Sequence, residues 1–201
     1  MSKAVLEKLL ARFGDAILET HSHFGDDTAV VASERWREVC EFCRKDPGLS
    51  FDMLTDLCGV DYPQRAPRVE VVLHLYSTVK RHRVRLKTRV GEPAEEGVLE
   101  IKNCELDTVV PVWPGANWFE RETFDMYGVK FKGHPDLRRI LMYPEFEGHP
   151  LLKDYPAEKT QPLIPYRDAD EDGKSLEKQA PFGPDEGMSF GRRNYTGKSE
   201  A

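Results

Sequence analysis

The segment NWFERETFDMYGVKFKGHP, from Asn117 to Pro135, gathers side chains that could do chemistry. Glu120, Glu122 and Asp125 supply carboxylates, and Arg121 lies among them. Glu122 and Asp125 would be neighbours on a helix, and paired carboxylates can separate their pKa values and act as the acid and the base of a hydrolase. The same mixture of charges and aromatic rings is typical of a surface that binds another protein.

The surrounding sequence favours the binding surface over catalysis. Arg121 would hold both neighbouring carboxylates in the ionised form. The chain contains no GxSxG nucleophile motif, no Cys/His signature, and no GxGxxG or GxxxxGKS phosphate loop. We therefore predict no catalytic residue in this chain, and a stand-alone hydrolase that uses Glu122 and Asp125 remains the alternative.

The segment has the pattern of an amphipathic helix that begins near Gly115. At roughly 100° per residue, one side would carry an apolar set, namely Ala116, Phe119, Thr123, Met126 and Tyr127. Arg121, Glu122 and Asp125 would lie on the opposite, charged side, together with Trp118. Because tryptophan is costly to leave in water and is enriched at interfaces, this placement predicts that Trp118 contacts a partner.

After the helix, the sequence becomes rich in proline and charge, with two related stretches, GHPDLRRILMYP and GHPLLKDYP. Since proline disfavours helix in the residue before it, both stretches are expected to be extended or turning. His134 and His149 lack a nearby Cys or acid constellation, so we expect capping or interface hydrogen bonds rather than metal binding. Arg138 and Arg139 are expected to pair with carboxylates of this chain or of a partner.

The residues before this segment predict an α+β domain. Amphipathic spacing indicates a helix from Val5 to Phe13, and a second helix, capped by Ser33, that ends before Pro47. Apolar and β-branched runs predict strands in AILET, TAVVAS, SFDMLTDLCGVDYP, VEVVLHLY and RHRVRLKTRV, with VEVVLHLY central and joined to RHRVRLKTRV as a hairpin. The expected fold class is α+β: a mixed sheet with helices packed on one face, followed by an extended C-terminal tail.

Cations alternate with other residues along RHRVRLKTRV, so five of them would share one sheet face: Arg81, Arg83, Arg85, Lys87 and Arg89. Two interpretations are open. The face is solvated, or it docks an acidic partner, because like charges in a row repel one another until something neutralises them. RNA binding is disfavoured, since no aromatic stacking platform is interleaved with the cations.

The cysteines and the HSH motif are weak candidates for metal sites. The four cysteines are expected to be thiols. Cys40 and Cys43 form a CxxC, but they recur at helical spacing with apolar residues and no second CxxC exists, so a buried helix face is predicted. His21 and His23 are expected in a solvated polar loop.

Composition excludes several other classes. The chain has 201 residues, 39% hydrophobic content and a net charge of −6, which argues against a general nucleic-acid binder. The N-terminal sequence is amphipathic and unlike a signal peptide, and no apolar run is long enough to span a bilayer. We expect a cytoplasmic chain whose membrane contact is indirect.

Three regions are expected. Residues 1–130 would form the α+β domain, and residues 131–156 an extended Pro/Gly-rich docking segment. Residues 157–201 have few aliphatic side chains and many prolines, glycines and acids, which is typical of a tail that binding partners order.

The spaced motif E-R-E-x-x-D-M-Y, followed by His134, Arg138 and Ile140-Leu141, resembles the complete signature of the thirty-kilodalton subunit family of respiratory complex I. In bacteria this family is the C-type subunit of NADH:quinone oxidoreductase. The flanking stretches PGANWFE and GHPLLKDYP also resemble that family, and the similarity covers residues 30–156.

The resemblance implies a cofactor-free subunit of the peripheral arm, on the cytoplasmic face of the bacterial inner membrane. FMN, iron–sulfur clusters and quinone would be bound by partner subunits, and the chief neighbour would be the forty-nine-kilodalton, D-type subunit. The signature and interface residues would be Trp118, Glu120, Arg121, Glu122, Asp125, His134, Arg138 and His149. A related complex that takes electrons from reduced deazaflavin, ferredoxin or hydrogen is the nearest alternative.

Overall fold

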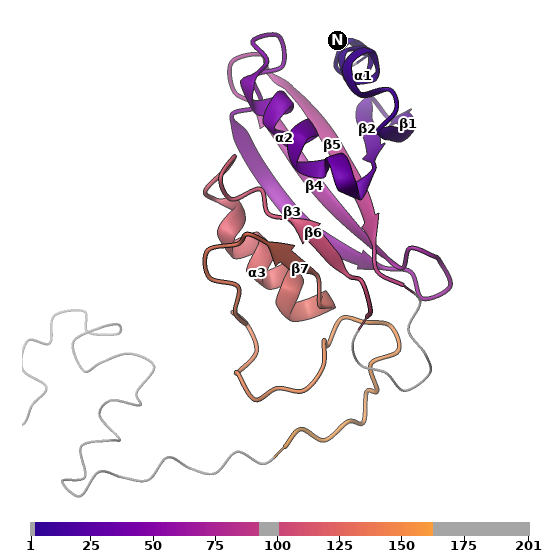
Figure 1. Cartoon of the computed structure of the whole chain (residues 1–201), viewed down its shortest axis with the longest axis vertical. Helices are drawn as coiled ribbons and strands as arrows, with labels where there is room; N and C mark the ends of the chain where they lie inside the picture. Colours follow the sequence, from indigo (N-terminus) through magenta and orange to yellow (C-terminus); the bar gives the residue numbers. More distant parts are fainter. Residues whose placement is uncertain (1–2, 93–100, 163–201) are drawn as a thin grey trace, which may run out of the picture. The chain divides into compact units, whose positions relative to one another are not determined.

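The predicted strands and helices form a mixed sheet covered by helices (Figure 1). The structure is a computed structural model that describes residues 3–92 and 101–162. The first half contains α1 (Lys3–Phe13), β1 (Ile17–His23), β2 (Asp26–Val31), the short 3-10 helix η1 (Ser33–Arg35) and α2 (Trp36–Lys45). The second half contains β3 (Met53–Asp61), β4 (Val69–Ser77), β5 (His82–Val90), β6 (Glu105–Asp107), α3 (Ala116–Tyr127) and β7 (Lys130–Lys132).

The main sheet has the strand order β1-β2-β5-β4-β3. β2 and β5 run parallel, and the other neighbouring strands run antiparallel. The predicted hairpin of β4 and β5 is confirmed, with Leu73 paired to Leu86 near its middle. β6 and β7 form a separate parallel pair after the sheet.

One face of the sheet carries the hydrophobic core. Alternate residues of β4 and β5 point into it, namely Val69, Val71, Leu73, Leu75, Val84, Leu86 and Val90. α1 and α2 contribute buried apolar residues to the same cluster, and α3 packs on β3, where the Tyr127 ring covers Gly59. The predicted fold class, a mixed sheet with helices on one face, is therefore confirmed.

Several local predictions are also confirmed. α1 covers the expected residues, and α2 ends before Pro47 and buries the CxxC. Because Cys40 and Cys43 are buried among apolar groups, their thiol pKa values are raised, that of Cys43 to about 12. All four cysteines are free thiols.

Two local predictions are wrong. Ser33 does not cap α2, since it opens η1 and its hydroxyl contacts Glu34 instead. His21 and His23 do not lie in a loop, because they belong to β1, where they pair with Thr28 and Asp26 of β2. The polar composition of an exposed edge strand made this stretch look like a loop.

Candidate subunit interface

Helix α3 carries the signature and is fixed at both ends. In the turn before it, the indole N–H of Trp113 donates to the carbonyl oxygen of Phe51 at 3.0 Å. The helix is followed by Gly128, whose φ of 81° is a left-handed conformation that glycine adopts at low cost. A Cβ atom there would lie 2.8 Å from the ring of His149, so the chain that returns to α3 also requires glycine at this position.

Glu120 is buried inside the domain. The hydroxyl of Thr108 donates to one carboxylate oxygen at 2.6 Å, and the backbone N–H of Val109 donates to the other at 2.7 Å. Burial raises the pKa of Glu120 to about 7, although these two hydrogen bonds oppose the rise. The side chain therefore joins α3 to the segment after β6.

Asp125 is also buried, which corrects its predicted place on the charged outer side of the helix. Nη1 of Arg139 lies 2.7 Å from Oδ1, and Oδ2 accepts the backbone N–H groups of residues 140–142 at 2.8–3.1 Å. Burial alone would raise the pKa of this carboxyl, but the hydrogen bonds from these donors outweigh it and lower the pKa. The segment after β7 covers the side of the helix that periodicity marks as exposed.

Arg121 does not hold the two acids of the helix, contrary to the prediction. Its guanidinium donates to the backbone carbonyl oxygens of Arg138 and Arg139, at 3.1 and 3.2 Å. Arg138 itself is exposed and pairs with Asp136 at 2.9 Å. The predicted pairing of Arg138 and Arg139 with carboxylates is thus confirmed, and both carboxylates belong to this chain.

The two histidines of the GHP triplets make hydrogen bonds to the backbone, as expected. The N–H of Asp136 donates to Nδ1 of His134, so Nε2 carries the proton and donates to the carbonyl oxygen of Asn117 at 3.2 Å. His149 is buried, and its Nδ1 lies 2.9 Å from the carbonyl oxygen of Asp125, which can only accept. Both rings attach the Pro-rich segment to α3.

Trp118 lies on the outer side of α3 with 69% of its surface exposed, as predicted. Glu122 is exposed on the same helix. The segment that Asp125 holds exposes three further apolar side chains, Leu141, Tyr143 and Leu151. We call these four residues, Trp118, Leu141, Tyr143 and Leu151, the outer apolar set. Exposed apolar side chains on a rigid support are a feature of protein interfaces.

A buried ion pair that sequence reasoning missed fixes the chain further along. Arg68, 1% exposed, contacts Asp61 at 2.7 Å and the half-exposed Asp154 at 2.8 Å. The N–H of Lys153 donates to the same Asp61. Arg68 and Asp154 are 86 residues apart, and no periodicity or motif relates them. The contact attaches the end of GHPLLKDYP to the ends of β3 and β4.

The basic strand is largely neutralised within the chain. Arg81 lies in the turn before β5, which corrects its place in the row. The pairs Arg83–Asp26, Lys87–Glu70 and Arg89–Glu19 have N–O distances of 2.6, 2.7 and 2.9 Å. Because these cations are paired within the chain, the charge repulsion along the strand is much weaker than its sequence indicates. An acidic partner is therefore much less necessary to neutralise it.

The structure also tests three other interpretations of the sequence, namely a catalytic carboxylate pair, a metal site and a membrane-spanning helix. Asp125 and Glu122 do not form an accessible carboxylate pair, because Asp125 is buried and bonded to Arg139 and residues 140–142. Among residues 3–92 and 101–162, no three His, Cys, Asp or Glu side chains are placed to hold a metal ion. In the same part of the chain, no helix has the length and apolarity needed to cross a membrane.

The fold and the buried network define an α+β domain in which a charged motif holds a Pro-rich segment against a helix. Comparison with known proteins identifies the family. Residues 29–161 match the family described as respiratory-chain NADH dehydrogenase, 30 kDa subunit, and the chain belongs to this family.

Relatives and solved structures agree with this assignment. The chain is 46% identical over 148 residues to the second C-type subunit of the NADH-quinone oxidoreductase of Rhizobium etli, with 74% of each chain covered. It is 49% identical over 152 residues to the C-type subunit of the same enzyme from Roseiflexus sp., an alignment that covers 76% of this chain and 82% of the relative. A trypsin-resistant fragment of Nqo5 is 30% identical with a TM-score of 0.54, over 67% of this chain and 98% of the fragment.

A chain of an archaeal membrane-bound sulfane sulfur reductase has a TM-score of 0.57 at 20% identity, over 70% of this chain and 75% of that one. This likeness shows the fold alone.

Proposed function

We propose that this chain is a cofactor-free structural subunit in the peripheral arm of a proton-translocating NADH:quinone oxidoreductase. It supports the quinone-side module while electrons pass from NADH through FMN and iron–sulfur clusters, bound by other subunits, to quinone. The observation that carries the proposal is the structural role of the buried signature residues. Glu120 joins α3 to the segment after β6, and Asp125 folds the Pro-rich segment onto α3; this leaves Trp118 exposed on a rigid support.

The signature residues then divide into two roles. Asp125 and His149 are buried and position the Pro-rich segment, together with Arg121 and His134, while the buried Glu120 fixes α3 to the segment after β6. Trp118, Glu122 and Arg138 are exposed and face a neighbour in the complex, chiefly the forty-nine-kilodalton, D-type subunit. The domain of residues 1–130 is the support, and residues 131–156 are the docking segment.

Residues 157–201 form the tail that partner subunits would order, and positions 163–201 lie outside the described residues. Attachment through its partners places the chain at the cytoplasmic face of the inner membrane. The same geometry also suits a complex fed by reduced deazaflavin, ferredoxin or hydrogen, because the electron donor binds elsewhere. The names of the relatives favour NADH.

Affinity purification of the tagged full-length chain from gently solubilised membranes tests the proposal. Mass spectrometry of the eluate and an NADH:quinone activity assay are the measurements. We expect cluster-bearing subunits, a hydrophobic membrane arm and NADH-driven quinone reduction. The same partners with another donor would indicate a related complex. Elution of the chain alone, with hydrolase activity that Asp125→Asn abolishes, would contradict the proposal.

A further inference from the structure

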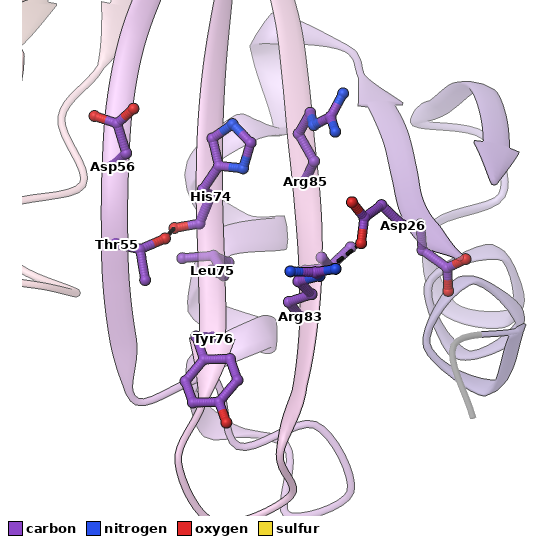
Figure 2. Close-up of a pocket in the computed structure, with 10 residues that line it drawn as sticks. Asp26, Thr55, Asp56, His74, Leu75, Tyr76, Arg83 and Arg85 are labelled. Atoms are coloured by element: carbon purple, nitrogen blue, oxygen red, sulfur yellow. Dashed lines mark hydrogen bonds and ion pairs between the residues drawn. The ribbon is translucent and has the colours of Figure 1, made fainter. Parts of the chain in front are cut away.

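One row of side chains crosses all five strands on the helix-free face of the sheet. His21 pairs with Thr28, Thr28 with Arg85, Arg85 with His74, and His74 with Asp56. Arg85 occupies the middle of this row, on the central strand β5. Figure 2 shows Arg85 and His74 side by side on neighbouring strands, with Asp56 and Asp26 on the flanking strands.

Arg85 differs from the other cations of its strand in its neighbours. Arg83, Lys87 and Arg89 each contact a carboxylate of this chain. The residues paired directly with Arg85 are Thr28 and His74, and neither is an acid. Within the described ranges, Arg85 has no ion pair, and its Nε atom is buried without a hydrogen-bond partner.

Two other polar atoms of the row share this property. Oγ1 of Thr28 and Nδ1 of His21 are buried and have no hydrogen-bond partner among the described residues. Buried polar atoms without partners are rare in folded proteins, because each costs the free energy of its lost hydration. Three such atoms at adjacent places in one row indicate a site that is completed by a group from outside the described chain.

A hollow of about 450 Å³ is lined by Arg85 (Figure 2), whereas Thr28 and His21 lie outside its lining, on the next two strands of the sheet. His74, Arg85 and Asp56 line it, and the Arg83–Asp26 pair lies at its edge. Burial, followed by the charge of Arg85, lowers the pKa of His74, so this ring is neutral at pH 7. Arg85 is then the one unpaired positive charge among the described residues of the hollow.

We propose that this hollow is a docking site for a single carboxylate side chain of a neighbouring subunit, with Arg85 as its anchor. The guanidinium fork matches a carboxylate in geometry and charge. The three acids at the hollow, Asp26, Asp27 and Asp56, and the net charge of −6 would repel nucleic acid or a polyacidic segment, so one acid within an otherwise neutral strand or loop fits best. The inference rests on the proposed function, because the occupant is part of the assembly.

Matched variants in the assembled complex test the inference. Arg85→Gln and Arg83→Gln remove the same charge, two residues apart on one strand face, but Arg83 already has Asp26 as its partner. The readout is the fraction of tagged full-length chain that stays on the complex during a salt wash. We expect Arg85→Gln to lower this fraction about tenfold, because it leaves the partner's carboxylate unpaired, and Arg83→Gln to stay within about twofold of wild type.

A photo-crosslinking amino acid in place of Tyr76, at the edge of the same hollow, gives a second measurement that does not require Arg85 to change. We expect a cross-link to a peptide of another subunit that contains Asp or Glu. Exchange of that acid for Arg should restore retention of the Arg85→Glu variant.

Equal retention of the two Gln variants would overturn the inference, and so would cross-links confined to this chain or to a peptide without an acid. If the wild-type chain does not join the complex at all, the proposed function fails first. If the wild type joins and Arg85→Gln joins equally well, the inference on Arg85 alone fails.

Discussion

Arg139 and Asp125 form a short ion pair, with 2.7 Å between Nη1 and Oδ1, that closes the Pro-rich segment onto α3. The same guanidinium donates to the carbonyl oxygen of Gly148 at 2.9 Å and lies over the ring of Phe146 at 5.6 Å. Arg139 thus connects the helix to both ends of the loop that exposes Leu141 and Tyr143. The contact explains why a charged residue of the signature is buried beneath a surface segment.

Asp125→Asn should destabilise the full-length chain by about 3 kcal/mol at pH 7, because it leaves Arg139 without its charge partner and replaces an acceptor of three N–H groups. Asp136→Asn, which removes an exposed Asp–Arg pair, is the matched control and should change stability by less than about 0.5 kcal/mol. Urea denaturation measures both. Because the folded pKa of Asp125 is lowered, its contribution is present above about pH 4, the unfolded pKa, and is lost as the pH falls through the folded pKa. Equal losses for the two variants would contradict the buried role.

Glu120→Gln should remove a pH dependence of the opposite sign. The pKa of Glu120 is raised from 4.5 to about 7, so the folded state binds a proton that the unfolded state has released between these values. The stability from this group is therefore fully present below pH 4.5 and is lost as the pH rises to about 7, by about 2–3 kcal/mol. Denaturation of wild type and variant at pH 5 and pH 8 should show the variant gaining relative stability at pH 8. Parallel pH profiles would show that Glu120 is ionised throughout.

Arg68→Met should cost about 3–5 kcal/mol, because it leaves the carboxylate of Asp61 buried without a cation. Asp154→Asn removes the half-exposed partner of the same guanidinium and should cost about 1 kcal/mol or less. Thermal unfolding reports both losses. Limited proteolysis should cut near residue 154 sooner in each variant than in wild type, and an unchanged cleavage pattern would show that the pair does not hold this segment.

Trp118→Ala should weaken incorporation into the complex at least about fivefold, while the melting temperature of the isolated chain changes by less than about 2 °C, because the side chain is 69% exposed. Phe119→Ala, its neighbour packed against the core, should show the reverse pattern. Co-purification and thermal scans of the two variants separate these roles. A large fall in melting temperature for Trp118→Ala, with normal incorporation, would place Trp118 in the core.

Periodicity was a sound guide where a single face decides burial. The spacing of Cys40 and Cys43 predicted the buried side of α2, and the alternation of Val84 and Leu86 predicted the inner side of β5. Local pattern was misleading at two places. The polar composition around His21 hid an edge strand that pairing with β2 stabilises, and the alternation that includes Arg81 extends one residue beyond the start of β5.

The sequence alone determined the secondary structure of the central elements, the mixed α+β class and the family, because apolar periodicity and a spaced signature are local properties of the chain. Only the tertiary structure decided which charges of the signature lie inside. Asp125 projects from the outer side of α3 and is nevertheless buried, since residues 139–142 return to cover it. Arg85 has no carboxylate partner among the described residues because the two strands that flank it, β2 and β4, place Thr28 and His74 beside it. Whether a side chain is buried or paired with a charge depends on its own element and on the segment that packs against that element. The position of a residue within its own element specifies only the first of these two surfaces.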